Sequence, residues 1–151
     1  SGYKDAAMSS IVFKLTNAMQ RDDLEQFMAT LQSYFASIPY DIRSGDEHYY
    51  QTIFFITFLL LGSNIEAEAR TNQGRIDAYV RTAKAVYIFE FKLDKSADAA
   101  VGQILDRRYY EKFQGGDLPI RLVGVNFDSK ERAIDGWEVR GIEDGTPVNK
   151  S

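Results

Sequence analysis

The sequence contains no cysteine and only one histidine, His48, and these absences exclude several classes of protein. Without cysteine there is no disulfide scaffold, zinc finger, iron–sulfur cluster or thiol nucleophile. A single histidine cannot build a multi-histidine metal centre. A bound metal would therefore need carboxylate and carbonyl oxygens, which are the ligands that suit Mg²⁺, Mn²⁺ or Ca²⁺.

Long hydrophobic runs are also absent. The longest, residues 53–61, is far shorter than the ~20 residues that a membrane-spanning helix needs. No basic stretch followed by an apolar one marks a signal peptide at the N-terminus. We therefore expect a cytoplasmic protein with no membrane partner. Because the chain begins without methionine, we expect an excerpt of a longer protein, with an internal start at Met8 as the alternative.

Positive charge is scarce overall but unevenly distributed. The 151 residues carry 18 basic and 22 acidic side chains, a net charge of −4, which argues against a protein that coats nucleic acid without specificity. Residues 75–113 are different, because they hold eight basic and six acidic side chains. If a polyanion binds, this stretch is where we expect it.

Hydrophobic periodicity predicts a single α/β domain. We expect helices over residues 10–20, 24–38, 47–61 and 96–114, and strands over 65–69, 76–80, 86–91, 119–127 and 133–139. The third helix is apolar around its whole circumference, which predicts burial on most sides. Residues 1–45 form an amphipathic helical pair that either packs on the rest of the domain or docks on an upstream one. Residues 46–151 form the second unit.

Charged residues of the predicted strands suggest a site. Glu90 and Lys92 are two apart in an otherwise apolar strand and so point to the same face. The short connection near residue 83 makes this strand a hairpin with the preceding one, which places Asp77 beside Glu90. Two adjacent carboxylates repel each other unless a cation lies between them, and a divalent ion would satisfy both. The alternatives are an ordinary salt bridge and a charged hairpin facing solvent.

Glu47 begins the third predicted helix and has two interpretations. Ser44 and Glu47 fit a capping box, in which Glu47 hydrogen-bonds the backbone at the helix start. Alternatively, Glu47 faces the same metal. His48 beside it is better explained as a polar residue near the helix start than as a catalytic base.

These residues together resemble a known family. The α-β-β-β-α-β order, with an acid on the first core helix, Asp77 on the second strand and Glu90-Phe91-Lys92 on the third, resembles the PD-(D/E)XK nuclease superfamily and its restriction-endonuclease-like fold. The phrases at residues 38–40, 74–77, 87–92 and 124–127 are similar to the branch found as the C-terminal domain of bacterial AAA-type ATPase-like proteins. Ile76 departs from the motif, which has proline there.

The resemblance implies a restriction-endonuclease-like core with a mixed central sheet flanked by helices and with extra N-terminal helices. It also implies a Mg²⁺ or Mn²⁺ site held by Asp77, Glu90, Glu47 and the backbone carbonyl of Phe91. Lys92 would orient the attacking water and stabilise charge on the scissile phosphate, leaving a 5′-phosphate. The polar residue that many members place near the metal would be Gln103, on the helix that follows.

Basic and aromatic residues near this motif predict a nucleic-acid-binding surface. Helical spacing from Gln103 places Arg107 and Tyr110 on one face. The nucleic-acid-binding set that we expect is Arg75, Lys95, Arg107, Arg108 and Tyr110. The alternative is a solvated helix face.

The leading hypothesis is a metal-dependent phosphodiesterase that hydrolyses nucleic acid, DNA rather than RNA. The competing hypothesis is a non-catalytic binding or regulatory module that docks on an upstream ATPase-like domain of the same chain. A purely structural α/β domain is the third possibility.

Overall fold

The computed structural model describes the backbone of residues 2–39, 47–72, 75–143 and 146–149, and side chains over 9–39, 49–71 and 76–142. The elements are α1 (Gly2–Gln20), α2 (Leu24–Ser37), α3 (Glu47–Leu61), β1 (Glu66–Asn72), β2 (Arg75–Arg81), β3 (Val86–Leu93), α4 (Ala97–Arg107), the 3₁₀ helix η1 (Tyr109–Phe113), β4 (Ile120–Asp128), β5 (Ala133–Glu143) and β6 (Thr146–Asn149).

The strands form one mixed sheet whose spatial order follows the sequence, from β1 to β6. Neighbouring strands are antiparallel except β3 and β4, which run parallel. Because parallel neighbours need a crossover connection, α4 follows β3 and returns the chain to the start of β4. The segment α3-β1-β2-β3-α4-β4 is the predicted restriction-endonuclease-like core, and the predicted fold class is confirmed.

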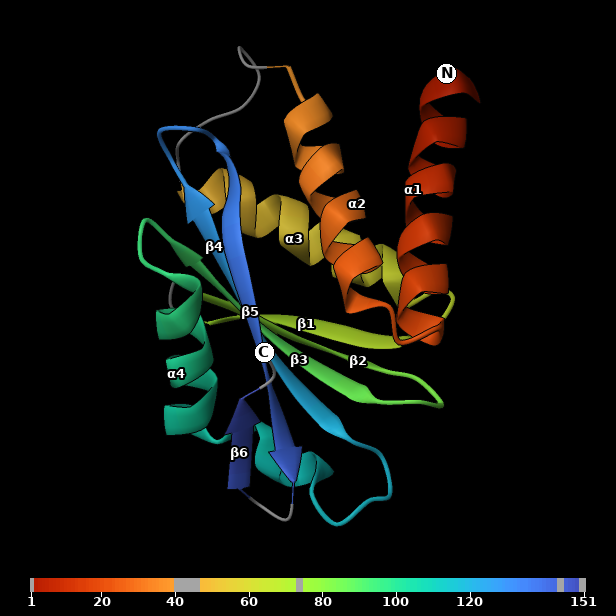
Figure 1. Ribbon diagram of the computed structural model, residues 1–151. Helices are drawn as coiled ribbons and strands as arrows, with labels where there is room; N and C mark the ends of the chain where they lie inside the picture. The colour runs from red at the N-terminus through yellow and green to blue at the C-terminus, as the bar shows by residue number, and fades with distance from the viewer. Residues whose placement is uncertain (1, 40–46, 73–74, 144–145, 150–151) are drawn as a thin grey trace.

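Helices cover both faces of the sheet (Figure 1). One core joins α1, α2 and α3 to one face, and a smaller core joins α4 and η1 to the other. We call these the α1–α3 face and the α4 face. Strand β3 is buried on both faces over Val86–Phe91, as its apolar sequence predicts. The helical pair α1–α2 thus shares its core with the sheet, while the predicted boundary at residue 45 stays a prediction.

The α1–α2 connection is tied to the sheet by Asp22. Its carboxylate accepts two hydrogen bonds from the Arg121 guanidinium, one of them 2.9 Å from Nε, and another from the Tyr87 hydroxyl. Burial and the nearby carboxylate raise the pKa of Tyr87, and the bond to Asp22 raises the pKa of Arg121. This cluster ties the segment that precedes α2 to strands β3 and β4.

Three local expectations need correction. Helix α3 keeps one exposed stripe, because Ile56 is 41 % and Leu59 is 63 % exposed, whereas Tyr50, Phe54, Thr57, Phe58 and Leu61 are buried. The helix expected over 96–114 starts after its predicted cap, Ser96, but ends at Arg107, because Arg108 adopts a left-handed conformation with φ of 59°. Strand β5 runs on to Glu143, and β6 was not predicted.

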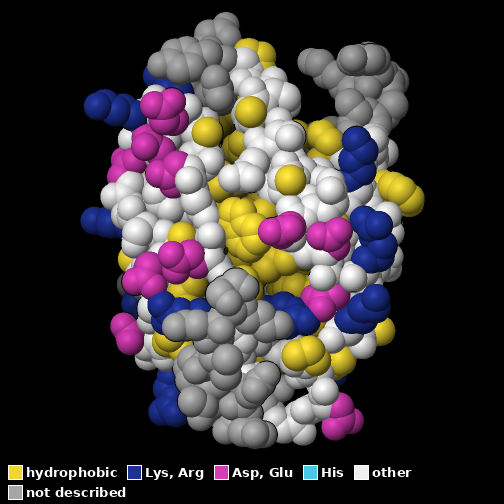
Figure 2. Space-filling model, in the orientation of Figure 1, with side chains coloured by type: hydrophobic (Ala, Val, Ile, Leu, Met, Phe, Trp, Pro, Cys, Tyr) yellow, Lys and Arg dark blue, Asp and Glu magenta, His cyan; other side chains and the backbone are white. Residues whose placement is uncertain are grey.

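No described helix has the length and the apolar composition that crossing a bilayer requires. Figure 2 shows hydrophobic side chains gathered in the middle of the face where β5 passes in front, with acidic and basic side chains around them. Trp137 and Val139 of β5 are partly buried and pack against the larger core.

Gly124 allows α4 to approach the sheet closely. A Cβ atom at this position would lie 2.2 Å from the carbonyl oxygen of Ala97 and 2.8 Å from the backbone nitrogen of Val101. Since real Cβ atoms do not come this close to backbone, any side chain here would push α4 away from β4.

We therefore expect Gly124→Ala to lower the free energy of unfolding by about 3 kcal/mol, the upper range for overpacking a core. Urea unfolding followed by circular dichroism measures this. Gly102→Ala is the matched control, because a Cβ there would meet nothing within 4 Å and a helical Gly→Ala change is stabilising. Equal stability of Gly124→Ala and the wild type would contradict the close packing.

Candidate active site

Asp77 and Glu90 are direct neighbours across the β2–β3 hairpin. They are register partners of this antiparallel pair, and such partners have Cα atoms about 4.5–5.5 Å apart. Their side chains point to the α4 face, since the alternating residues Ile76, Ala78 and Phe89 belong to the core on the α1–α3 face. The hairpin therefore places two carboxylates side by side, as the sequence predicts.

Glu90 is completely buried, whereas Asp77 is half-buried. Both carboxylate oxygens of Glu90 are shielded from solvent. On its other side, the register partner of Glu90 in β4 is Gly124, over which α4 lies. Glu90 is thus enclosed by the helix that Gly124 admits, and Asp77 stands on the open side of the pair.

Lys92 follows on the same face of β3 and is partly buried. Its ammonium group donates a hydrogen bond to the Oε1 atom of Gln103 on α4. The Ser96 hydroxyl caps α4 by accepting from the Ala99 backbone N–H at 3.0 Å, which fixes where the helix starts and so where Gln103 lies. The two predicted site residues thus contact each other.

Asn126 is a site neighbour that the sequence analysis did not single out. It is the β4 register partner of Lys92 and is 4 % exposed. Its Oδ1 atom accepts from the Lys95 backbone N–H at 3.0 Å, and its Nδ2 donates to Asp135 Oδ1 at 2.9 Å. Asn126 therefore holds the loop between β3 and α4. Its position beside Lys92 depends on the parallel β3–β4 pairing.

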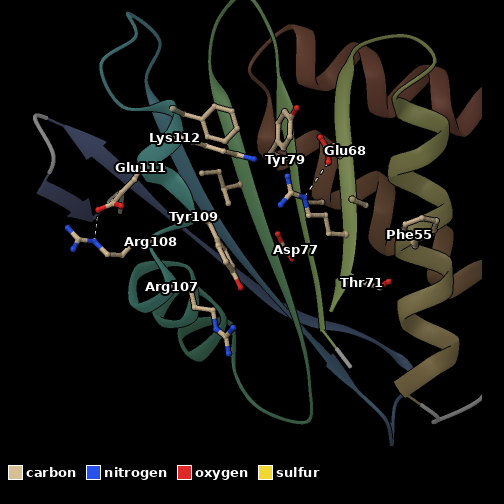
Figure 3. A pocket seen from close by; sticks show the side chains of 15 residues that line it. Phe55, Glu68, Thr71, Asp77, Tyr79, Arg107, Arg108, Tyr109, Glu111 and Lys112 are labelled. Atoms are coloured by element: carbon tan, nitrogen blue, oxygen red, sulfur yellow. Dashed lines mark hydrogen bonds and ion pairs between the residues drawn. The ribbon is translucent and has the colours of Figure 1, made fainter. Parts of the chain in front are cut away.

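A cleft opens beside Asp77, between the β1–β2 strands and the segment from the end of α4 through η1 (Figure 3). Its volume is about 800 Å³. We call it the Asp77 cleft, and it is lined by Phe55, Glu68, Ala69, Arg70, Thr71, Asp77, Ala78, Tyr79, Ile88, Arg107, Arg108, Tyr109, Glu111, Lys112 and Phe113.

Two of the cleft's arginines form exposed ion pairs, seen as dashed lines in Figure 3. Arg70 Nε lies 3.3 Å from Glu68 Oε1 on β1, and Arg108 Nε lies 2.6 Å from Glu111 Oε1 on η1. Arg70 is also the register partner of Asp77, so a basic residue stands on the open flank of that carboxylate. Arg70 was not among the predicted site residues, although the β1–β2 register could have found it.

The predicted nucleic-acid-binding residues are scattered. Arg107 and Arg108 line the Asp77 cleft, but Lys95 lies in the loop after β3 and does not. Tyr110 is 7 % exposed and belongs to the smaller core, because the chain leaves helical geometry at Arg108. The side chain of Arg75 lies outside the described residues.

The donor chemistry around Asp77 and Glu90 suits a hard divalent cation. Two neighbouring carboxylates provide oxygen ligands only, and the backbone carbonyl of Phe91 is next along the chain. Among the residues whose side chains the structure describes, no three acidic or histidine side chains come together in a metal-binding group. The side chains of Glu47 and His48 lie outside the described residues.

Comparison with known protein families identifies the chain's relatives. Residues 45–137 match the PD-(D/E)XK nuclease superfamily. The chain belongs to this superfamily. The matched residues include Asp77, Glu90, Lys92 and Gln103, and superfamily members typically use divalent metals.

The chain is also similar to an uncharacterized protein in the vnfD 5′ region of Azotobacter chroococcum mcd 1. The two are 32 % identical over 136 residues, which is 85 % of this chain and 26 % of that protein. The chain therefore spans about a quarter of the length of this relative.

The loop that carries Lys95 is held by a carboxylate, which gives a pH-dependent prediction. Asp94 accepts hydrogen bonds from the backbone N–H of Ser129 at 2.8 Å and from its hydroxyl at 2.6 Å. These bonds hold the pKa of Asp94 below its usual range, with a smaller contribution from Lys95. A depressed folded-state pKa stabilises the fold above the unfolded pKa of about 3.9, and this contribution is lost as the pH falls through the folded-state value.

We expect Asp94→Asn to be less stable than the wild type at neutral pH, and the gap to close below about pH 4. Urea unfolding at a series of pH values measures the gap, with Asp117→Asn at an exposed position as control. A gap that stays constant down to pH 2 would contradict the role of the Asp94 charge.

Proposed function

We propose that this domain is a metal-dependent phosphodiesterase that hydrolyses nucleic acid, with DNA as its preferred substrate. The observation that carries the proposal is the arrangement of Asp77 and Glu90 as cross-strand partners. Lys92 lies on the same face and is hydrogen-bonded to Gln103. Membership of the PD-(D/E)XK nuclease superfamily supports a phosphodiester as the bond that is cleaved.

In this proposal Asp77, Glu90 and the Phe91 carbonyl would hold Mg²⁺ or Mn²⁺, and Glu47 would supply a further carboxylate. A bound divalent cation supplies Lewis acidity at the phosphoryl oxygen and lowers the pKa of its water. Hydrolysis would add the oxygen of a water molecule to phosphorus, break the bond to the leaving oxygen, and transfer a proton from the water to the leaving oxygen.

The protein's own groups orient the reaction. The Lys92 ammonium balances the negative charge that develops on the phosphate and positions the attacking water. Gln103 acts through Lys92, because its Oε1 atom accepts the lysine's hydrogen bond and limits the rotamers of that side chain. The closed side at Glu90 and the open side at Asp77 imply that the substrate phosphate approaches from the Asp77 cleft.

We expect Asp77→Asn and Lys92→Met each to reduce cleavage by about 100-fold or more, the usual loss when one group that stabilises the transition state is removed. The assay follows labelled linear, plasmid and single-stranded DNA, and RNA, with Mg²⁺, Mn²⁺ or EDTA. Asp117→Asn and Lys130→Met are matched controls at exposed positions outside the site. Cleavage that persists in EDTA, or in both site variants, would refute the proposal.

A second candidate is a binding module that keeps the fold without turnover, carried by a larger protein with an ATPase-like domain. Exposed hydrophobic side chains on the helices favour it: Phe13 of α1 is 70 % exposed, and Ile56 and Leu59 of α3 are 41 % and 63 % exposed. Such residues are typical of surfaces that contact a partner when they form a patch.

Metal binding separates the two candidates. For the phosphodiesterase we expect calorimetric titration with Mn²⁺ to give one binding event that Asp77→Asn weakens at least about 10-fold, since a ligand is lost. Asp117→Asn should bind like the wild type. No heat at any Mn²⁺ concentration would favour the non-catalytic module.

A further inference from the structure

Helix α4 leaves part of the sheet uncovered, and this is where the Asp77 cleft lies. It packs on β3, β4 and β5. The cleft is lined instead mainly by residues of β1 and β2, by Arg107 at the end of α4, and by Arg108, Tyr109, Glu111, Lys112 and Phe113 after it. Phosphodiester hydrolysis by itself does not require the aromatic and basic side chains that gather there.

We propose that the Asp77 cleft binds unpaired nucleotides, so that the domain prefers a single strand of nucleic acid to a duplex. The inference deepens the proposed function and rests on it for the placement of the strand, since the scissile phosphate would lie at Asp77. The binding itself does not depend on turnover.

An aromatic pair forms one wall. The rings of Tyr79 on β2 and Phe113 on η1 have centroids 5.0 Å apart and planes at 56°. The Lys112 ammonium lies 4.9 Å from the first ring centroid and 5.1 Å from the second. Proteins that bind single strands combine aromatic faces, on which bases stack, with cations that follow the phosphates. Because Lys112 is exposed, its ammonium can turn from the rings to a phosphate.

The charge of the cleft also fits a polyanion. Four basic side chains line it against three acidic ones, Glu68, Asp77 and Glu111. Glu68 and Glu111 form exposed ion pairs with Arg70 and Arg108. Exposed ion pairs are weak, so each arginine can leave its glutamate and bind a phosphate instead. The two remaining cations of the lining are Arg107, at the end of α4, and the lysine of the aromatic wall.

The shape of the cleft argues against a duplex. Direct readout of duplex DNA commonly uses a protruding helix or β-ribbon that enters the major groove, which is about 12 Å wide. Here the surface is concave, and its volume of about 800 Å³ is that of pockets that enclose small molecules, roughly 300–1,000 Å³. A few unpaired nucleotides fit such a space, and a duplex cross-section does not.

The test is fluorescence anisotropy in EDTA, where cleavage is prevented. The probes are a labelled oligothymidylate of about 20 nucleotides, longer than the ~4–16 nucleotides that single-strand sites cover, and a duplex of the same length. We expect the single strand to bind at least about 10-fold more tightly than the duplex. Phe113→Leu and Tyr79→Leu, which keep apolar bulk but remove the flat ring, should each weaken single-strand binding about 10-fold.

The matched controls are one substitution on the opposite side of the molecule and one at an exposed lysine outside the cleft. Phe13→Leu changes an exposed aromatic side chain on α1, on the other face of the sheet, and Lys130→Ala is compared with Lys112→Ala. Both controls should bind like the wild type, while Lys112→Ala should bind more weakly and with a smaller salt dependence. Thermal unfolding of each variant verifies that the fold is kept.

The inference is overturned if the protein binds neither probe, if it binds duplex as tightly as single strand, or if folded Phe113→Leu and Tyr79→Leu bind like the wild type. It stands, and the proposed function fails, if the single-strand preference and its loss in the variants are found but no metal supports cleavage. Metal-dependent cleavage of duplex with no single-strand preference would overturn the inference and leave the proposed function standing.

Discussion

Glu90 places a carboxyl group with no exposed surface in the central strand of the sheet, and taking a carboxyl group out of water has a desolvation cost that its surroundings must offset. Its burial follows from the packing next to it. Gly124, its neighbour in β4, has no side chain to hold α4 away, so the helix closes over Glu90. An ordinary β protein would place an apolar residue here, as at Ile88 two positions earlier on the same face. A buried acid beside a second acid is therefore unusual for the interior of a sheet, and such pairs of acids occur more often at functional sites than elsewhere.

The site is best understood as a row of residues running across the sheet on its α4 face. Strand register aligns Arg70, Asp77, Glu90 and Gly124 on four successive strands. Helix α4 covers the part of the row at Glu90 and Gly124 and leaves the Arg70–Asp77 part open to the cleft. The row therefore runs from a water-excluded end, where charge interactions are strong, to an accessible end, where a ligand can enter.

How much of the fold and of the candidate site could be predicted depended on whether each feature is determined by residues that are close together in the sequence. The Asp77–Glu90 pairing follows from equal distances to a short turn, so neighbouring residues were enough to predict it. The end of α4 could not be predicted, because Arg108, and not a glycine, adopts the left-handed conformation there. Asn126 lies beside Lys92 only because β3 and β4 run parallel, and a single sequence does not specify strand order. The cleft residues of β1 and η1 likewise meet only in the folded chain. The boundary at residue 45 and the role of the acid that begins α3 stay predictions.

In the proposed function, the acidic pair would also determine how the binding of substrate and the binding of metal depend on each other. At an ionic strength of about 0.1 M, charges farther apart than ~10 Å are largely screened, so the overall charge of −4 matters less to a phosphate than the groups lining the cleft. The nearest of these to the proposed reaction centre is Asp77, which repels a phosphate, with Glu90 behind it. In the proposed function, a divalent cation on the two carboxylates would cancel their negative charge at that point. In the proposals made above, a strand bound without the metal would be held by the cations of the cleft, and the charge of Asp77 would keep its phosphate from the reacting position.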